Sequence, residues 1–392
     1  MDFRVFALLL ASLSTMPATD IYLPSLPGMA SQFGVEASAI KDTIALFQIG
    51  SLLSALFLGI LSDRYGRKPL ILISLCFFLG GSLLCTFANH FSLFVAGRVL
   101  EGMGAVGIPV VGWALVHEAY SKEQGTRIMA LFGAVFAIMP LISPTLGGYI
   151  DVHFGWRWDF AGLSILCALA IPICAFAVKE SLSPTLSEPL NLKSYFANCM
   201  FVLHNKTFLF YVILFAFLLI GEWCYLTLIP FYFEKSLYFG PEECGFAISI
   251  IGITYILGSM ITPKLLHLFG FEKTIGLGLA ASLIGAALLV AFTLSPKNVQ
   301  VESAIAISVY LFGIAIIWAP STTKSLHTLK KQKGLASSIR SLLFTFASAL
   351  GSFLASVLTD RSLFPLAGIL LICALLALAL FKIQRYSEVR NF

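Results

Sequence analysis

Apolar residues along this chain form repeated, almost uncharged blocks of about 20 residues, such as Ile71–Ala88, Phe208–Phe233 and Leu363–Phe381. An α-helix rises ~1.5 Å per residue, so a block of that length crosses the ~30 Å hydrocarbon core of a bilayer. Membrane-spanning strands need only about half that length and alternate apolar with polar residues, which these blocks do not do. The pattern therefore predicts an all-α integral membrane protein.

The composition supports a chain that lies in lipid. Only 11% of its 392 residues are charged and 58% are hydrophobic, whereas soluble domains carry ~25% charged residues. The N-terminal run Val5–Leu13, which follows Arg4, has the look of a secretory leader. It continues into Asp20-Ile21-Tyr22 without a small-x-small cleavage site, so we predict that it is the first membrane span.

Gly, Pro and charged residues divide the apolar sequence into twelve expected spans. Their approximate bounds are 4–26, 41–61, 69–88, 91–117, 126–150, 160–178, 207–233, 244–266, 273–294, 301–323, 335–358 and 363–384. The connection Lys179–Lys206 is longer than most and lies near the midpoint. We therefore predict two pseudo-symmetric six-helix halves, residues 1–180 and 207–392, joined by a cytoplasmic linker at 181–206.

Basic residues in the loops predict the orientation. With the N-terminus inside, Arg98 lies within a span and 19 of the 25 Lys and Arg residues lie on the inside. The outside loops then carry only Lys41, Arg157, Lys235, Lys297 and Arg361. We expect both termini in the cytoplasm and, given the compact loops, a location in a bacterial inner membrane. The net charge of +5 reflects this distribution rather than a surface for nucleic acid.

The sequence lacks the motifs of several other activities. Its eight cysteines are scattered, without a CxxC pair or a Cys/His cluster, so we expect neither a metal site nor a disulfide framework. It contains no HExxH, GxSxG or GxxxxGK[ST] motif, so we expect no enzyme activity, no cofactor and no ATP-driven pump. A receptor would normally add a soluble domain, for which the loops are too short.

The connection between the second and third spans carries the most specific motif. Gly59–Lys68 reads GILSDRYGRK and resembles the G-x-L-x-D-R-x-G-R-K signature of the major facilitator superfamily. Gly59 permits close approach of helices, Gly66 permits a tight turn, and Asp63 can interact with the basic side chains beside it.

These residues suggest a latch that joins the two halves on the cytoplasmic side. Arg64, Arg67 and Lys68 lie beside Asp63, and Glu118 at the end of the fourth span is a further partner for Arg67. A turn flanked by positive-inside residues would explain the three basic residues, but not Asp63 or the glycines.

Three more segments extend the resemblance over nearly the whole N-terminal half, while the C-terminal half follows in layout. Arg98–Gly104 is similar to the R-x-x-Q-G-x-G motif, Pro144–Gly148 to a motif of antiporters, and Asp20–Pro27 to the opening of the Bcr/CflA group of drug exporters. Two residues depart from these patterns, because Glu101 replaces a Gln and Ser143 a Gly. The resemblance implies a drug:proton antiporter whose two halves rock around a central cavity.

Charged residues inside a span are functional candidates, because burying a charge is costly. Asp20 lies ~24 Å along the first span and Arg98 ~10 Å below the outer surface, so the two can pair if they face one cavity. Arg98 and Glu101 are three residues apart on one helix. We predict that Asp20 is the proton-coupling carboxylate, with Arg98 and Glu101 beside it. The alternatives are a static ion pair and a helix-capping Asp20.

Glu222 is the fourth intramembrane charge, at a depth in the seventh span similar to that of Asp20 in the first. Since these spans open the two halves, the two acids are near-equivalent by repeat. We predict a substrate site formed by Glu222, Tyr22, Trp223 and Tyr225, in which the aromatic rings offer cation–π faces. The alternative is an ordinary interfacial belt of aromatic residues.

Pro140, Pro144, Gly147 and Gly148 mark the fifth span as a hinge or, alternatively, a static kink. Together these features predict a monomeric, proton-coupled exporter of small lipophilic or cationic compounds that works by alternating access. The same architecture also suits a dedicated metabolite exporter or a proton-coupled importer.

Overall fold

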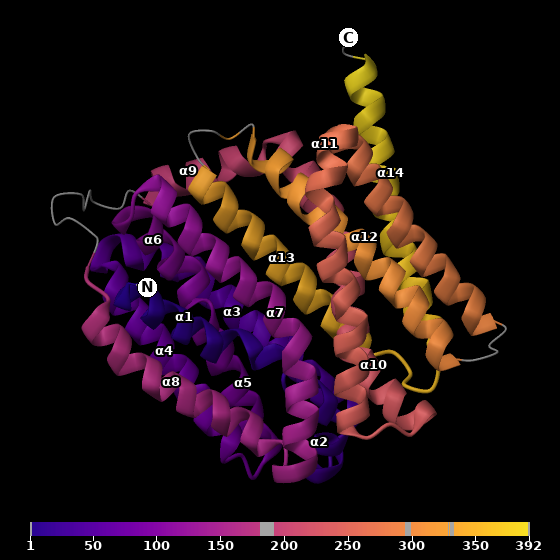
Figure 1. Cartoon of the computed structure of the whole chain (residues 1–392), viewed down its shortest axis with the longest axis horizontal. Coiled ribbons are helices and arrows are strands. Elements are labelled where there is room, and N and C mark those ends of the chain that lie inside the picture. Colours follow the sequence, from indigo (N-terminus) through magenta and orange to yellow (C-terminus); the bar gives the residue numbers. More distant parts are fainter. Residues whose placement is uncertain (1, 181–191, 295–298, 328, 330–332, 391–392) are drawn as a thin grey trace. The chain divides into compact units, whose positions relative to one another are not determined.

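A computed structural model describes residues 2–180, 192–294, 299–327, 329 and 333–390, and these residues form helices and turns without any strand (Figure 1). The chain divides into two compact units. Unit 1 comprises Met1–Asn191 and Gly240–Phe246, and unit 2 comprises Leu192–Phe239 and Ala247–Phe392. Residues 181–191 of the expected linker lie outside the described residues, and its remainder contains a helix, α9 (Leu192–Leu203), that the sequence did not predict.

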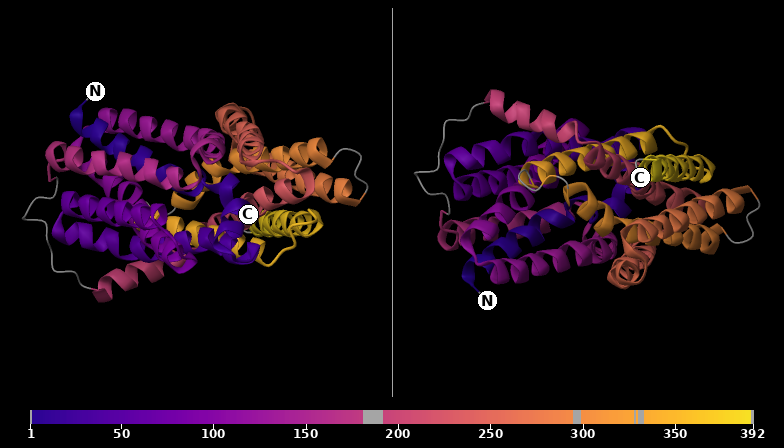
Figure 2. Two further views of the ribbon diagram at one scale, coloured as in Figure 1. Left: turned by 90° about the horizontal axis from the view of Figure 1, so that it is seen from below. Right: turned by 90° about the horizontal axis from the view of Figure 1, so that it is seen from above.

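The helices follow the expected spans closely. In unit 1 they are α1 (Phe3–Thr15), α2 (Leu26–Phe33), α3 (Ala37–Tyr65), α4 (Arg67–Thr86), α5 (Phe91–Ala105), α6 (Trp113–Ala119), α7 (Lys122–Phe154) and α8 (Arg157–Ala177). After α9 come α10 (Lys206–Leu237), α11 (Pro241–Leu294), α12 (Val299–His327), α13 (Lys333–Ser356) and α14 (Phe364–Arg390). Within unit 1 the long helices run side by side in both further views (Figure 2).

Eleven helical stretches of the described chain are long and apolar enough to cross a membrane. One of them, α11, has 54 residues and contains Gly270 in a non-helical conformation, with φ 73° and ψ 178°. At ~1.5 Å per residue, α11 would extend for ~80 Å, far more than one bilayer thickness. It therefore consists of two helices across a kink, which makes twelve spans and confirms the predicted fold class.

Large apolar side chains point outward from the spans. Phe176 is 86% exposed, Met260 73% and Ile383 67%. Water would make such surfaces unfavourable, whereas lipid chains cover them without cost. Exposure of this kind agrees with an integral membrane protein.

The first span is interrupted rather than continuous, contrary to the single helix expected over 4–26. Between α1 and α2 lie two 3₁₀ turns, Met16–Thr19 and Leu23–Ser25, with Asp20 at the end of the first. Proline removes a backbone donor and crowds the preceding turn. Pro17 and Pro24 each stand in the first positions of one of these turns, which accounts for the unwinding.

The fourth span is also interrupted, where a single helix was expected over 91–117. Between α5 and α6 the backbone forms a short π-helix, Ile108–Gly112, that contains Pro109. Such bulges are rare and often lie at functional sites. Both interrupted spans belong to unit 1. Asp20 lies in the first break, and Arg98 and Glu101 lie on α5, the helix that precedes the second break.

Glycines bring α3, α4 and α5 into direct backbone contact. A Cβ on Gly81 of α4 would lie 2.3 Å from the backbone nitrogen of Glu101, and one on Gly104 of α5 would lie 2.2 Å from that of Phe78. Gly102 of α5 lies against the backbone of α3 in the same way. Small residues at such positions let membrane helices pack more closely than larger side chains allow.

In unit 2 the central helix is α10, which contacts α12, α13 and α14. The Tyr310 hydroxyl of α12 donates a hydrogen bond to the Leu218 carbonyl at 3.3 Å. The same hydroxyl would lie 2.2 Å from a Cβ on Gly221, so a larger residue there would have to displace the Tyr310 side chain. Gly221 immediately precedes Glu222 on α10, so Tyr310 packs against α10 next to this acid.

Candidate functional site

Arg98 and Glu101 form a fully buried ion pair on α5. Both side chains are 0% exposed, and the Arg98 Nη1 atom contacts the Glu101 carboxylate. The Ser82 hydroxyl of α4 donates a second hydrogen bond to Glu101, at 2.5 Å. The ion pair and this hydrogen bond offset part of the cost of burying the two charges. The interaction expected from their i,i+3 spacing is present.

Aromatic rings enclose the Arg98 guanidinium. Its central carbon lies 4.4 Å from the ring centroid of Tyr22 and 4.4 Å from that of Phe47. Phe160 of α8 lies at 5.7 Å. The Nε and Nη2 atoms of Arg98 make no hydrogen bond to any described residue. Cation–π contacts and the ion pair therefore hold the guanidinium in place. Tyr22, which we expected at a substrate site, is 0% exposed and packs on Arg98.

Asp20 lies in the break of the first span and is partly buried. The expected Asp20–Arg98 ion pair is not formed among the described residues, because Arg98 pairs with Glu101 and donates to the backbone carbonyl of Ala18 at 3.1 Å. Depth along a helix was a poor guide here, because the chain unwinds just before Asp20 and its side-chain direction no longer follows helical spacing. Arg98 thus contacts the segment that carries Asp20 through its backbone.

The four residues expected to form a hinge lie in one continuous helix, α7, with Pro140 and Pro144 inside it. A Cβ on Gly147 would lie 1.6 Å from the Ile21 carbonyl oxygen, next to Asp20. A Cβ on Gly148 would lie 2.2 Å from the carbonyl oxygen of Pro241. Gly147 therefore allows α7 to contact the break in the first span, and the hinge stays a prediction.

In unit 2, Glu222 of α10 is partly buried and interacts electrostatically with Tyr255 of α11 and Tyr310 of α12. Of its expected aromatic partners, Tyr225 is buried and Trp223 partly exposed. The structure thus brings this acid close enough to interact with two tyrosines that are distant in sequence, which local inspection of α10 could not reveal.

The predicted latch residues gather around Arg67 at the start of α4. Arg67 lies 2.5 Å from Asp63 and 2.8 Å from Glu118, and donates to the Ser62 hydroxyl at 2.5 Å. The expected Glu118–Arg67 pair is therefore present. All these contacts lie within unit 1, so a latch that joins the two halves stays a prediction.

Gly66 turns the chain between α3 and α4. Its φ of 101° is unfavourable for any residue with a side chain, as the expected tight turn requires. The exposed Arg64 stacks on the Tyr65 ring at 5.3 Å and takes no part in the Arg67 cluster.

The prediction that helices approach closely at Gly59 is wrong, because no described atom lies within 4 Å of its would-be Cβ. The outer face of α3 is exposed there, as Phe57 shows at 61%.

Glu180 completes this cluster, and the sequence did not predict it. Its carboxylate accepts hydrogen bonds from the backbone nitrogens of Arg67, at 2.9 Å, and Lys68, at 3.1 Å. These nitrogens begin α4, where amide donors lack partners within the helix and a negative charge is favourable. Glu180 lies 113 residues from Arg67 in sequence, so only the fold brings the two together.

A second contact near this cluster ties the beginning of α1 to the end of α6. The Tyr120 hydroxyl donates to the Asp2 carboxylate at 2.5 Å. This hydrogen bond, followed by one from the Arg4 backbone, lowers the pKa of Asp2. Burial, together with the Asp2 bond, raises the pKa of Tyr120 to about 12.

Two buried charges escaped the sequence analysis. Asp159 in the first turn of α8 is 0% exposed, and neither carboxylate oxygen has a hydrogen-bond partner among the described residues. It lies one position before the expected sixth span, so a search confined to the spans excluded it. Lys41, which we assigned to an outside loop, is 1% exposed within α3. In both cases the aromatic or apolar residues that flank the charge in the sequence could have indicated that it is buried.

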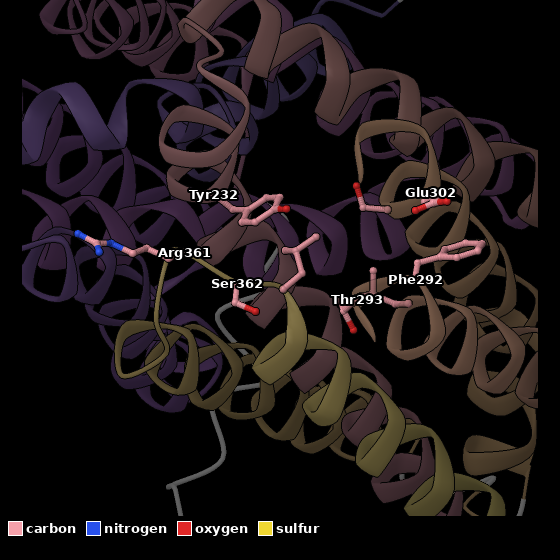
Figure 3. A pocket seen from close by; sticks show the side chains of 9 residues that line it. Tyr232, Phe292, Thr293, Glu302, Arg361 and Ser362 are labelled. Atoms are coloured by element: carbon pink, nitrogen blue, oxygen red, sulfur yellow. The ribbon is translucent and has the colours of Figure 1, made fainter. Parts of the chain in front are cut away.

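Unit 2 contains a small cavity of about 180 Å³ between α10, α11, α12 and the segment before α14 (Figure 3). The Tyr232 ring lies beside it, while the Arg361 side chain points away. Binding sites for drug-sized molecules usually measure ~300–1,000 Å³, so this cavity alone is too small for one. The described residues also contain no group of three or more His, Cys, Asp or Glu side chains placed to hold a metal ion.

Known proteins resemble the chain along nearly its whole length. A bicyclomycin resistance protein homolog of Haemophilus influenzae is 26% identical over 361 residues, covering 91% of this chain and 90% of that protein. Multidrug resistance protein MdtL of Klebsiella pneumoniae is 24% identical over 376 residues, covering 95% and 93%. A crystal structure of a D-xylose-proton symporter shares the fold, with a TM-score of 0.75, 15% identity and 96% of each chain covered.

A family description covers most of the sequence as well. Residues 8–329, and in a second match residues 211–391, match the Major Facilitator Superfamily. The twelve spans and the GILSDRYGRK motif agree with that match. The chain therefore belongs to the Major Facilitator Superfamily.

Proposed function

We propose that this protein is a proton-coupled exporter of small lipophilic or cationic compounds. The observation that carries the proposal is the arrangement in unit 1, where a fully buried Arg98–Glu101 pair lies against a broken first span that presents Asp20. Broken spans form the ion and substrate sites of many secondary transporters. The names of the relatives, resistance to bicyclomycin and to multiple drugs, support efflux as the direction.

In this proposal Asp20 carries the proton. A carboxyl group that faces alternate sides of the membrane takes up a proton on one side and releases it on the other. Arg98 is already neutralised by Glu101, so it holds the backbone at Ala18 without fixing Asp20 in a permanent ion pair. Glu222 with its neighbouring tyrosines binds the cationic part of a substrate.

Movement between the two access states comes from rocking of the two halves, residues 1–180 and 207–392. The cluster of Asp63, Arg67 and Glu118 acts as the cytoplasmic latch, with Arg64 and Lys68 as flanking charges. The protein works as a monomer in a bacterial inner membrane, with both termini in the cytoplasm, as the distribution of Lys and Arg indicates.

The test is transport of a lipophilic cationic dye by the purified protein in liposomes with an imposed pH gradient. We expect gradient-driven movement in the wild type, its loss in Asp20→Asn, and its retention in Glu36→Gln, which changes an exposed acid outside the spans. Full gradient-driven transport by Asp20→Asn would exclude Asp20 as the coupling group. Failure of the wild type to move the dye would instead favour a dedicated metabolite transporter.

A second arm addresses the substrate site. Glu222→Gln should reduce transport of cationic dyes more than that of neutral compounds, because it removes charge but keeps the shape. Unchanged affinity and substrate range in this variant would remove Glu222 from the site.

A further inference from the structure

Arg340 of α13 lies against a cluster of aromatic rings in unit 2. Phe215 of α10, Trp318 of α12 and Phe344 of α13 contact one another, with ring centroids 5.1, 5.2 and 5.7 Å apart. The Arg340 guanidinium lies 5.7 Å from the Phe344 centroid and 6.0 Å from that of Trp318. Arg340 is the eighth residue of its helix, ~10 Å along it, so this cluster lies inside the span.

The donors of Arg340 are largely unused. Its Nη2 atom donates to the Ser337 hydroxyl at 3.4 Å, while Nε and Nη1 are buried and have no partner among the described residues. Stacking on rings uses the faces of a guanidinium and leaves the N–H groups at its edge free to donate. Buried donors without an acceptor cost free energy, so the site favours a ligand that supplies one.

No carboxylate of the described residues supplies that acceptor. The described residues form no ion pair with Arg340, whereas Arg67 and Arg98 each pair with a carboxylate. Glu272 pairs with Lys324 at 2.7 Å and also accepts from Tyr211 at 3.0 Å. An arginine near the cytoplasmic end of a span normally extends to the lipid headgroups or to water. The Nε and Nη1 atoms of Arg340 are instead buried.

The face of α12 that carries Trp318 also carries a second unpartnered polar group. The buried Thr322 hydroxyl oxygen makes no hydrogen bond to a described residue. Thr322 follows Trp318 by four residues on α12, so the two share one face of the helix. Trp318 is 41% exposed, which leaves one wall of the site open to an incoming molecule.

We propose that Arg340, Thr322 and the rings of Trp318 and Phe344 bind the carboxylate of a planar aromatic acid. The fork of N–H donors matches the two oxygens of a carboxylate, and the rings stack on the attached aromatic group. The inference rests on the proposed function and extends its substrate class from cations to aromatic acids and zwitterions. Glu222 and Phe215 lie seven residues apart on α10, about two turns along one face, so a molecule with both an amine and a carboxylate suits this unit.

The experiment measures binding of 2-naphthoate and of its neutral isostere 2-naphthamide to the full-length protein in detergent, without a pH gradient. We expect naphthoate to bind the wild type at least ~10-fold more tightly than naphthamide, which corresponds to ~1.4 kcal/mol. Arg340→Gln should abolish this preference, Arg340→Lys should retain part of it, and Thr322→Val should weaken naphthoate alone. Arg361→Gln, an exposed arginine of the same unit, should keep the full preference.

Equal binding of the two compounds by the wild type, or no binding of naphthoate, would overturn the proposal. So would a preference that survives in Arg340→Gln. Each variant is first compared with the wild type by size-exclusion profile and helical content, and Arg340→Lys serves if Arg340→Gln does not fold. Because binding needs neither a gradient nor Asp20, a negative result here is separate from failure of proton-coupled transport.

Discussion

Arg67 illustrates how one side chain can organise a whole turn. Its guanidinium contacts Asp63, Glu118 and Ser62, while its backbone nitrogen donates to Glu180. The side chain thus connects the end of α3, the start of α4 and the end of α6. Hydrogen bonds to charged groups contribute more than neutral ones, although exposure reduces their value.

Replacement of Arg67 by Ala should destabilise the protein by about 1–3 kcal/mol, because three acceptors lose a charged donor. The expected observation is a lower midpoint of thermal unfolding in detergent. Arg64→Ala is the matched control, since Arg64 is exposed and stacks on the Tyr65 ring, and it should change stability by no more than ~0.5 kcal/mol. Equal midpoints for the two variants would contradict the central place of Arg67.

The Asp2–Tyr120 contact predicts a dependence on pH. The pKa of Asp2 is lowered from its usual 3.8 in the folded protein, mainly by the Tyr120 hydrogen bond. A lowered pKa contributes stability above the unfolded value, and that stability is lost as the pH falls through the folded value. The pKa of Tyr120 is raised to about 12, so the bond persists across neutral pH.

Tyr120→Phe should therefore unfold at a lower temperature than the wild type at pH 7, and the difference should disappear as the pH falls below the lowered pKa of Asp2. Thermal unfolding at a series of pH values measures it. Tyr65→Phe, at an exposed position, should show no such trend. A difference that grows in acid would mean that the sign assigned to Asp2 is wrong.

At the scale of elements, the sequence predicted the spans far better than their interruptions. Apolar block length specifies where a helix crosses, and all twelve crossings follow from it. The breaks depend on prolines that a membrane helix often tolerates, so Pro17, Pro24 and Pro109 did not by themselves distinguish a kink from a change of helix type. The π-helix at Ile108–Gly112 contains Pro109, but the sequence did not indicate that the helix type changes there.

In the candidate site, the sequence predicted contacts between residues close together on one helix or at neighbouring span ends better than contacts between distant helices. The Arg98–Glu101 pair followed from spacing on one helix, and the Glu118–Arg67 pair from two span ends on one membrane face. The Glu180 contact and the tyrosines around Glu222 depend on how separate helices pack, which a single sequence does not specify. The expected Asp20–Arg98 pair was wrong because depth was counted along a helix that is in fact unwound.

Gly147 provides a test of the contact between α7 and the break in the first span. Its would-be Cβ lies 1.6 Å from the Ile21 carbonyl oxygen, so Gly147→Ala forces the segment that carries Asp20 to move. Displacement by about 1 Å at a functional site commonly costs ~10-fold or more in rate. We expect at least that loss in dye transport by Gly147→Ala, at normal abundance in the membrane.

The control lies in the same helix. Gly133 has no atom within 4 Å of its would-be Cβ, so Gly133→Ala should transport as well as the wild type. Wild-type rates in Gly147→Ala would show that the Asp20 segment tolerates displacement.

At the scale of the whole molecule, the two compact units differ slightly from the expected halves. Unit 2 includes α9, whereas Gly240–Phe246, which comprises Gly240 and the first six residues of α11, belongs to unit 1. Within unit 1 these residues contact α7, where a Cβ on Gly245 would lie 2.1 Å from the carbonyl oxygen of Pro144. The start of α11 is therefore attached to α7, although the rest of that helix belongs to the other unit.

Orientation is the prediction that belongs to this scale. With 19 basic residues assigned to the inside and five to the outside, both termini should be cytoplasmic. Green fluorescent protein fused after Phe392 should therefore fluoresce in intact bacteria, whereas a fusion after Phe154, in an expected outside loop, should not. A dark C-terminal fusion that is nevertheless present at full length would reverse the topology.

The backbone contacts among α3, α4 and α5 have a mechanical consequence. Where helices contact each other through glycine, no flexible side chains lie between them to adjust if one helix slides past the other. Gly81, Gly102 and Gly104 therefore join α3, α4 and α5 into one rigid group. Strain imposed on unit 1 must then be taken up where the backbone is already irregular, at Met16–Ser25 and at Val106–Gly112. The two breaks are the compliant points of the unit, and one of them carries Asp20.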